Sequence, residues 1–343
     1  MKENKTLKII LRALLVLFTT IVLLFIAVVG VVWVVLRGPS PSAQELLTRS
    51  LKETSAIGFI PDLFLPKSRV AEIMSYREEV PEQEEVDTSL VTITATHRET
   101  VHGSEPVSGS DSTDAGDGIE FIGITGANYR GILMVVQDPF RVFVGTPDRY
   151  GDTGLTLEQM ISKYDALAGV NGGGFYDPGG SGDGGTPDGI VITDGNLVWG
   201  GAGTYSNVIG IDADGILHVG WMSAQEAMNR KIQWACSFGP SLIVNGEPQT
   251  GSAIAAGGVN PRTAIGQRAD GAILLLVVDG RQITSLGATF EDLISIFMEH
   301  GAVNAANLDG GSSSSMIYQG EAMNINASVV GTRPLPTAFL VRK

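Results

Sequence analysis

An uncharged apolar run near the N-terminus, "ALLVLFTTIVLLFIAVVGVVWVVL" from Ala13 to Leu36, constrains this chain most. As an α-helix it would be about 36 Å long at 1.5 Å per residue, which is enough to cross a bilayer. A cleaved signal peptide is the alternative, but the run exceeds the usual h-region and no small-residue cleavage site follows before Arg37. We therefore expect an uncleaved, single-pass transmembrane helix over residues 13–36.

The basic residues before this run predict its orientation. They are Lys2, Lys5, Lys8 and Arg12. Because positive residues favour the cytoplasmic side, residues 1–12 are expected to form a cytoplasmic tail. The C-terminal domain would then be extracellular and attached to the cell membrane.

The charge balance and cysteine content narrow the class of protein. The net charge is -14, and the clustered Lys and Arg that nucleic-acid binding needs are missing. We therefore expect no nucleic-acid partner. One cysteine, Cys236 in "IQWACSFG", excludes an intrachain disulfide and suggests a bacterial cell surface. It is expected to be a small core hydrophobe, since nothing nearby would lower its pKa.

Residues 37–118 are predicted to be a stalk and linker. "SAQELLTRSLKETSA" and "KSRVAEIMSYREEV" have apolar residues at helical spacing. "PEQEEVD" is an acidic run, and "HRETVHGSEPVSGSDSTDAGDG" is polar and rich in Gly and Ser. The acidic run could be an interaction tail, but a solvated linker is the simpler interpretation.

Residues 119–343 have the pattern of one folded domain. Short apolar runs are broken by Gly, Asp and Asn, and several are joined by Asp-Gly or Asn-Gly hairpin turns. Two helices are expected, one starting at Thr156 with Gln159 in the capping-box position, and one from Thr289 to Gly301. The predicted class is α+β, with a β-rich, mainly antiparallel sheet domain and a few helices.

Four polar clusters flanked by glycine stand at the ends of predicted strands, where a rigid scaffold would position them. They are "GVNGGGFYDPGG", "TPDGIVITDG", "GVNPRTAIGQ" and "NLDGGSSSSM". Each alone is explained by turn chemistry, since Asn-Gly and Asp-Gly pairs tolerate positive φ. Their combined chemistry is more informative than any one of them.

Brought together, these clusters could act on an anionic sugar. Asp309 and Asp188 are candidate catalytic carboxylates, and Asn171 is a candidate donor to a sugar hydroxyl. Arg262 offers a fork that matches a phosphate or carboxylate, although a structural Arg paired with a nearby carboxylate explains it equally well. The glycines would let backbone N–H groups approach an anion closely. They are Gly172, Gly173, Gly174, Gly310 and Gly311.

Other catalytic chemistries lack their residues. There is no G-x-S-x-G elbow, no P-loop sequence and no Cys/His spacing typical of zinc. None of the histidines lies in a glycine-flanked polar cluster; they are His97, His102, His218 and His300. A divalent cation held by Asp177, Asp183 and Asp188 is an alternative, but solvated loop carboxylates are the simpler interpretation. We expect no cofactor, with a divalent cation left open.

Five stretches between Ile119 and Lys343 occur in the order of a known family. They are "VNGGGFYD", "GPSLIVNG", "NPRTAIGQ", "NLDGGSSSSM" and "RPLPTAFLV". On these motifs the domain resembles the phosphodiester glycosidases. The family often has N-[GA]-G-[FY]-F, so "GGGFY" is a small departure at Phe175 and Tyr176.

The resemblance implies removal of a sugar joined through its anomeric carbon to a phosphodiester. A phosphomonoester leaves as a stable anion, so protonation of the leaving group matters less than in ordinary glycoside hydrolysis. Asp309 would stabilise the oxocarbenium-like sugar or activate water, with Asp188 as the second choice. The negative charge would be held by Arg262 and by the residues after Asp309, at about 3 kcal/mol per well-placed donor. Those residues are Gly310, Gly311, Ser312 and Ser313.

These observations predict a membrane-anchored cell-surface hydrolase whose partner is a phosphorylated glycan of a bacterial cell wall or exopolysaccharide. A non-catalytic module that binds phosphorylated surface glycans could use the same Arg and Gly turns. A structural partner in exopolysaccharide assembly is a third hypothesis. A carboxylate beside the bound anion, together with Arg262, would distinguish an enzyme from a binder.

Overall fold

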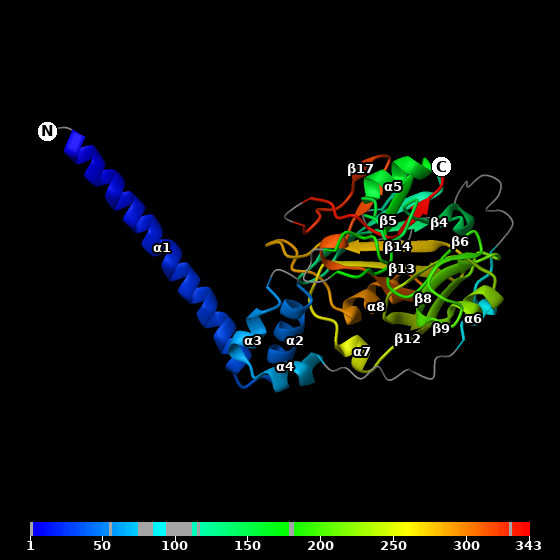
Figure 1. Ribbon diagram of the computed structural model, residues 1–343, viewed down its shortest axis with the longest axis horizontal. Helices are drawn as coiled ribbons and strands as arrows, with labels where there is room; N and C mark the ends of the chain where they lie inside the picture. The colour runs from blue at the N-terminus through cyan, green and yellow to red at the C-terminus, as the bar shows by residue number, and fades with distance from the viewer. Residues whose placement is uncertain are drawn as a thin grey trace.

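The structure is a computed structural model in which one long helix extends from a β-rich domain (Figure 1). It describes residues 3–54, 57–74, 85–93, 112–114, 117–177, 182–328 and 331–343. Most of the polar Gly/Ser-rich segment, including His97 and His102, lies outside the described residues.

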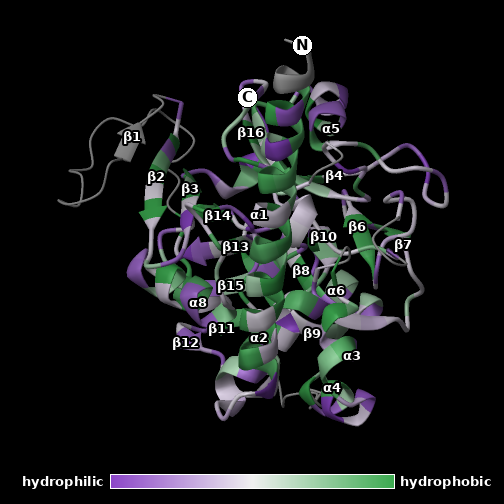
Figure 2. Ribbon diagram, turned by 90° about the vertical axis from the view of Figure 1, so that its left-hand side faces the viewer, coloured by the Kyte–Doolittle hydropathy of each residue, from purple (hydrophilic) through white to green (hydrophobic). Residues whose placement is uncertain are grey.

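Helix α1, Glu3–Arg37, contains the predicted apolar run. The most apolar 18-residue window within Leu7–Arg37 has a mean hydropathy of 3.1, and none of this window is buried inside the protein. Figure 2 shows hydrophobic residues along most of this helix. A helix with this length and composition can be a membrane anchor or a signal sequence. Which side of a membrane the domain faces stays a prediction.

The segment expected to be a spacer is instead packed onto the domain. The two predicted helical stretches form α2, Pro41–Lys52, and α4, Lys67–Met74, with the short α3, Ile60–Phe64, between them. After α4, Val86 and Val91 belong to the main hydrophobic core. The domain therefore includes residues before position 119, because these apolar side chains are buried in it.

The largest sheet has eight strands in the order β1-β2-β3-β14-β13-β15-β11-β12. Its central strand β14 is buried on both faces. Ile273, Leu275 and Val277 pack into one core cluster, whereas Leu274, Leu276 and Val278 pack into another together with helix α8, Phe290–Glu299. The strand bounds are Ser112–Asp114, Ile119–Thr125, Arg130–Val136, Ile273–Val278, Arg262–Arg268, Ala302–Leu308, Ser241–Val244 and Glu247–Pro248, in the same order.

Two five-stranded sheets complete the domain, in the orders β7-β6-β10-β8-β9 and β17-β16-β5-β18-β4. Every pairing between described strands is antiparallel, which confirms the predicted mainly antiparallel α+β class. The first sheet consists of Asn196–Trp199, Val191–Thr193, Ile232–Ser237, Tyr205–Asp212 and Leu217–Ser223. The second consists of Glu321–Ala322, Met316–Tyr318, Ala168–Asn171, Ala338–Val341 and Val142–Gly145.

Both predicted helix starts are confirmed. The Thr156 side chain accepts from the Gln159 amide at the start of α5, Leu157–Tyr164, and Thr289 forms the same capping box with Asp292 at the start of α8. The remaining short helices are α6, Ala224–Asn229, and α7, Ser252–Ala255. Cys236 is buried in the core, and burial raises its thiol pKa to about 12, so its predicted structural role is confirmed.

Candidate active site

A cavity of about 750 Å³ opens where strand ends of the three sheets meet helix α2. It brings together most of the residues expected to act: Asp188, Arg262, Asp309, Gly310, Gly311, Ser312 and Ser313. Asn171, Gly172 and Gly173 do not line it. The polar clusters therefore divide into residues that face the cavity and residues that support it.

Asp309 lies at the end of β15, where the backbone turns into the cavity. Its amide donates to the carbonyl oxygen of Gly172 at 3.0 Å. Gly311 has φ 62°, a value that favours glycine, and its amide donates to the Pro261 carbonyl at 2.9 Å. Burial raises the pKa of the Asp309 carboxyl to about 6, although the Ser313 hydroxyl and the charge of Arg333 favour its ionised form. Asp309 can thus change its protonation state near neutral pH.

Asp188 is the second carboxylate of the cavity. Asp188 is exposed to the solvent in the cavity, but the protein around it removes part of the water from its carboxyl. This partial desolvation raises the pKa of the carboxyl. A Cβ on Gly174 would lie 2.7 Å from Asp188 Oδ2 and 2.5 Å from Phe238 Cδ2. Glycine at position 174 is therefore required for Asp188 to occupy this place.

Asn171 lies behind the Asp309 turn and holds it in place. Its side chain is completely buried, and Nδ2 donates to the Asp309 carbonyl at 2.6 Å. Its Oδ1 accepts from Thr263 Oγ1 at 2.7 Å and from the Ser315 amide at 3.1 Å. This differs from the expected donor to a sugar hydroxyl, because the amide already has protein partners and does not face the cavity.

Gly172 and Gly173 also differ from the expected anion-binding turn. Their amides donate to Thr337, to its carbonyl at 3.0 Å and to its hydroxyl at 2.8 Å respectively. A Cβ at either position would lie about 2.6 Å from Thr337 Oγ1 or the Ser237 carbonyl oxygen. Glycine is needed at both positions because the chain packs closely there. The sequence alone shows only repeated glycines, and these are equally compatible with close packing and with anion binding.

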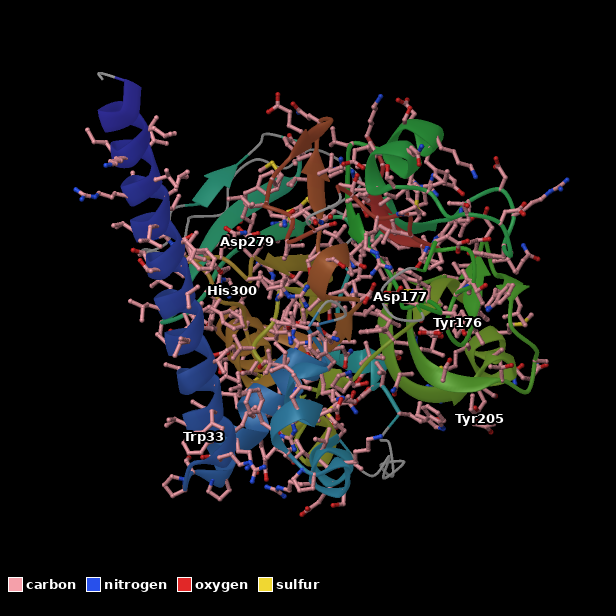
Figure 3. The ribbon with its side chains drawn as sticks, turned by 60° about the vertical axis from the view of Figure 1, so that its left-hand side comes forward. Trp33, Tyr176, Asp177, Tyr205, Asp279 and His300 are labelled. Atoms are coloured by element: carbon pink, nitrogen blue, oxygen red, sulfur yellow. The ribbon has the colours of Figure 1, made fainter. Side chains whose placement is uncertain are left out.

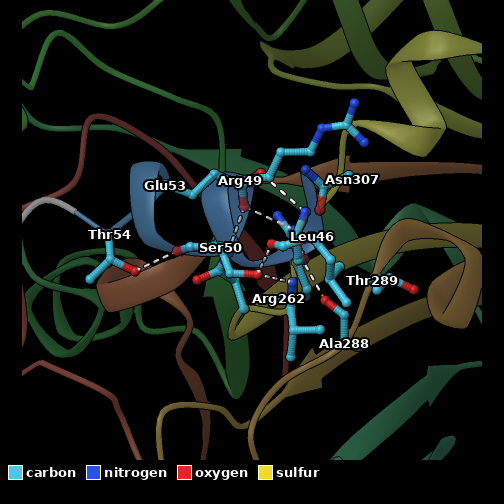
Figure 4. A network of polar contacts seen from close by, with 12 residues as sticks. Leu46, Arg49, Ser50, Glu53, Thr54, Arg262, Ala288, Thr289 and Asn307 are labelled. Atoms are coloured by element: carbon cyan, nitrogen blue, oxygen red, sulfur yellow. Dashed lines mark hydrogen bonds and ion pairs between the residues drawn. The ribbon is translucent and has the colours of Figure 1, made fainter. Parts of the chain in front are cut away.

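Arg262 is paired with Glu53 from α2 (Figure 4). Nη2 lies 3.0 Å from Glu53 Oε2, and the guanidinium also donates to the carbonyl oxygens of Gly258 and Ala288. Burial lowers the pKa of Arg262 and the Glu53 charge opposes this effect. The structure thus shows an Arg that is paired with a carboxylate inside the cavity. A phosphate clamp by this residue stays a prediction.

Helix α2 packs closely on this part of the cavity. Glu53 Oε2 accepts from Asn260 Nδ2 at 2.6 Å, and Glu53 Oε1 accepts from the Gly258 amide at 3.2 Å. A Cβ on Gly258 would lie 2.6 Å from the backbone nitrogen of Ser50. The Glu53 carboxylate therefore has three partners, which are Arg262, Asn260 and the Gly258 amide.

Three further arginines, Arg49, Arg281 and Arg333, line the cavity and were missed by sequence reasoning. Arg333 Nη1 lies 2.8 Å from Asp177 Oδ2 and 3.3 Å from Ser312 Oγ, and its guanidinium lies 5.0 Å from the centre of the Phe175 ring. Burial acts to raise the pKa of the Asp177 carboxyl. The hydrogen bond from Arg333 and that from the Gly182 amide outweigh this effect and hold the pKa below its usual value. The signal for Arg333 was its place in "RPLPTAFLV".

Arg281 comes from the turn after β14. Its Nη2 donates to Asn260 Oδ1 at 3.2 Å, and a Cβ on Gly311 would lie 3.2 Å from the same nitrogen. Its guanidinium is therefore adjacent to the Asp309 turn. The sequence around it, "VVDGRQIT", contains only an ordinary Asp-Gly turn, so no local pattern separates Arg281 from other surface arginines.

The cation hypothesis gains no support from the described residues. Within them, no group of three or more His, Cys, Asp or Glu side chains is arranged to hold a metal ion. Asp177 is paired with Arg333, and Asp183 Oδ1 accepts from the Gly185 amide at 3.0 Å. The divalent cation stays a prediction without a site.

Comparison with known proteins connects this geometry to one family. The model of the phosphodiester glycosidase family matches residues 164–342. The N-acetylglucosamine-1-phosphodiester alpha-N-acetylglucosaminidase of Mus musculus is 27% identical over 216 residues, covering 57% of this chain and 41% of that protein. The SPbeta prophage-derived uncharacterized protein YomE of Bacillus subtilis (strain 168) is 40% identical over 91 residues, covering 26% and 14%. The chain spans less than half the length of these curated relatives.

A solved structure has a similar fold. It is described as the zebrafish N-acetylglucosamine-1-phosphodiester alpha-N-acetylglucosaminidase catalytic domain auto-inhibited by pro-peptide. It aligns with a TM-score of 0.55 and 24% identity, covering 71% of this chain and 85% of that chain. At this identity the likeness shows the fold.

Proposed function

Because the chain belongs to the phosphodiester glycosidase family, we propose that it is a hydrolase that releases a sugar from a sugar-1-phosphodiester. The observation that carries this proposal is the presence of Asp188 and Asp309 in one cavity with four arginines. A module that only binds phosphorylated glycans would use the arginines, but two carboxylates would repel its ligand. The combination therefore favours an enzyme over a binder.

The arginines and the Asp309 turn would hold the departing phosphate. Arg281 lies against Gly311, and Arg333 reaches Ser312, so the two cations flank the same turn. Hydrogen-bond donors placed where charge develops are the usual means of stabilising such a leaving group. The phosphate would lie between this turn and Arg262.

Asp309 is the proposed carboxylate beside the anomeric carbon. Above its pKa of about 6 it is ionised and can stabilise a developing oxocarbenium ion or activate a water molecule. Asp188, which lines the same cavity from the turn before β6, is the second candidate. Attack at carbon needs no metal-activated nucleophile.

Helix α2 would limit access to this site. The Glu53 carboxylate lies on Arg262 and Asn260, where an anionic substrate group would bind. The zebrafish relative is described as auto-inhibited by a pro-peptide, and here Arg49 of α2 and Glu53 at its C-terminal end line the cavity. We propose that the domain is held at a bacterial cell surface by α1 and that its substrate is a wall or exopolysaccharide glycan.

The test is turnover of a panel of sugar-1-phosphodiesters by the full chain in oxygen-18 water. A glycosidase leaves the label on the released sugar, because water attacks the anomeric carbon and the phosphate keeps its original oxygens. Label on the phosphate would show attack at phosphorus and would contradict the proposal. Binding of the diesters without release of sugar would support the non-catalytic alternative.

A further inference from the structure

One wall of the cavity carries an aromatic ledge that has no part in the chemistry described above. It is formed by Tyr205 and Asn207 of β8 and Trp221 of β9, all of which line the cavity. Trp221 pairs with Asn207 across the hairpin, and Tyr205 lies two residues from Asn207, so the three side chains share one face of the sheet. The rings of Tyr205 and Trp221 are nearly parallel, with centroids 6.5 Å apart and planes at 25°.

This ledge and two of the cavity's arginines come from different sheets. It belongs to the sheet β7-β6-β10-β8-β9, whereas Arg262 and Arg281 come from the ends of β13 and β14 in the eight-stranded sheet. In the view of Figure 3, Tyr205 and Asp279 lie on opposite sides of Asp177. Asp188 lines the same cavity, and a Cβ on its neighbour Gly189 would lie 2.7 Å from the Cβ of Ser206 in β8.

The ledge residues are not accounted for by the core. Tyr205 is 54% exposed, and neither it nor Trp221 packs into a core cluster. Among the described residues, none is a hydrogen-bond partner of the Asn207 side-chain amide. A Cβ on Gly239 would lie 2.8 Å from Asn207 Nδ2, so glycine at 239 leaves room for this amide. The ledge thus offers an exposed Tyr205 ring, the neighbouring Trp221 ring and a polar amide.

We propose that Tyr205, Asn207 and Trp221 form the subsite for the pyranose ring of the sugar that is released. The apolar C–H face of a pyranose stacks on an aromatic ring, and an amide can both donate to and accept from its hydroxyls. This inference rests on the proposed function, since a sugar-1-phosphodiester places its sugar and its phosphate on opposite sides of the bond that breaks.

The subsite can be tested by binding, without turnover. Saturation-transfer difference NMR would measure the affinity of the full chain, in detergent, for methyl α-glucopyranoside and methyl N-acetyl-α-glucosaminide. We expect at least one to bind, and Tyr205→Ala to weaken it about 10-fold, which is about 1.4 kcal/mol. Tyr205→Phe keeps the ring and should bind normally. The matched control is Tyr176→Ala, because Tyr176 is 66% exposed and does not line the cavity.

Three outcomes decide the proposal. Loss of glycoside affinity in Tyr205→Ala with unchanged affinity for inorganic phosphate supports the subsite, even if no diester is hydrolysed. If Tyr205→Ala does not fold, Asn207→Ala is the replacement and should show the same selective loss. Diester hydrolysis with equal glycoside affinity in all variants, or no glycoside binding to the wild type, would overturn the subsite. The first of these two results would leave the proposed function intact.

Discussion

Two glycine-rich turns of this molecule have nearly the same sequence pattern but different surroundings. Asn171-Gly172-Gly173 follows β5 and is buried, whereas Asp309-Gly310-Gly311 follows β15 and lines the cavity. They are joined directly, since Asn171 Nδ2 donates to the Asp309 carbonyl and the Asp309 amide donates to the Gly172 carbonyl. The first turn therefore supports the second.

The difference between the turns is where their polar groups find partners. Around Asn171 the side-chain amide and the glycine N–H groups are bonded to the protein, mainly to Thr263, Ser315 and Thr337. At Asp309 the carboxylate is buried enough for a raised pKa but remains beside open space. A glycine-rich turn is thus a candidate site only where the fold leaves the polar side chain of the turn facing a cavity.

The largest expected effect is that of Asp309→Asn, which should lower kcat about 10³-fold. The amide keeps the shape but lacks the charge that stabilises a developing cation. KM should change little, and the thermal midpoint at pH 7.5 should not fall, since burial disfavours the ionised carboxylate at this site. Steady-state kinetics and thermal unfolding measure both. An active Asp309→Asn with an inactive Asp188→Asn would reverse the ranking of the two carboxylates.

Asn171→Ala should instead destabilise the protein, by about 2 kcal/mol or about 30-fold in the folding equilibrium, because Thr263, Ser315 and Asp309 each lose a buried partner. Denaturant titration measures this. Ser312→Ala, on the cavity side, is the matched control and should have little effect on stability. A stable Asn171→Ala variant with raised KM would restore the role of sugar-hydroxyl donor.

The pH dependence of kcat/KM should report the ionisation of Asp309, the carboxylate of the turn that lines the cavity. If the ionised carboxylate is active, kcat/KM falls about 10-fold per unit below pH 6 and is constant above pH 7. The residual activity of Asp309→Asn should lack this inflection. A rate that rises as the pH falls through 6 would make Asp309 a general acid instead.

The same raised pKa predicts the sign of a stability change. Between pH 4 and 6 the folded protein binds more protons at Asp309 than the unfolded chain does. Its contribution to the free energy of unfolding is therefore lost as the pH rises through this window. The free energy of unfolding should be measured for the wild type and for Asp309→Asn at pH 4.5 and at pH 7. The difference between the two proteins at each pH isolates the contribution of Asp309.

The smallest effect is expected for Glu53→Gln, which should raise kcat/KM about 5-fold by removing a charge that competes with the substrate at Arg262, or about 1 kcal/mol. Glu45→Gln is the matched control, because Glu45 is on the same helix but pairs with Arg69. Unfolding must be measured alongside, since the change leaves a buried arginine without its carboxylate. A loss of activity with unchanged stability would show that Glu53 assists the reaction rather than blocking the site.

Several features of the fold could be predicted because their signals are local. The apolar run of α1 and the capping boxes at Thr156 and Thr289 depend on residues within a few positions of one another. Strand β15, "AVNAANL", lacks the apolar pattern of a core strand because it contains buried asparagines. Asn304 Oδ1 accepts from the Asn245 amide at 3.0 Å, and Asn307 Nδ2 donates to the Gly239 carbonyl at 2.8 Å. Only the neighbouring chain makes these polar residues compatible with a core strand.

In the candidate site, too, some features follow from adjacent residues and others depend on residues far apart in the sequence. The sequence by itself determined the family motifs and the place of Asp309 in a glycine turn, because these are patterns of adjacent residues. Only the tertiary structure decided that Asn171 is a support and that Arg281 and Arg333 flank the Asp309 turn. It alone decided, too, that Glu53 lies on Arg262, a residue 209 positions away. The reason is physical: whether a charged or polar side chain acts on a ligand depends on which distant groups satisfy it first, and that is set by packing.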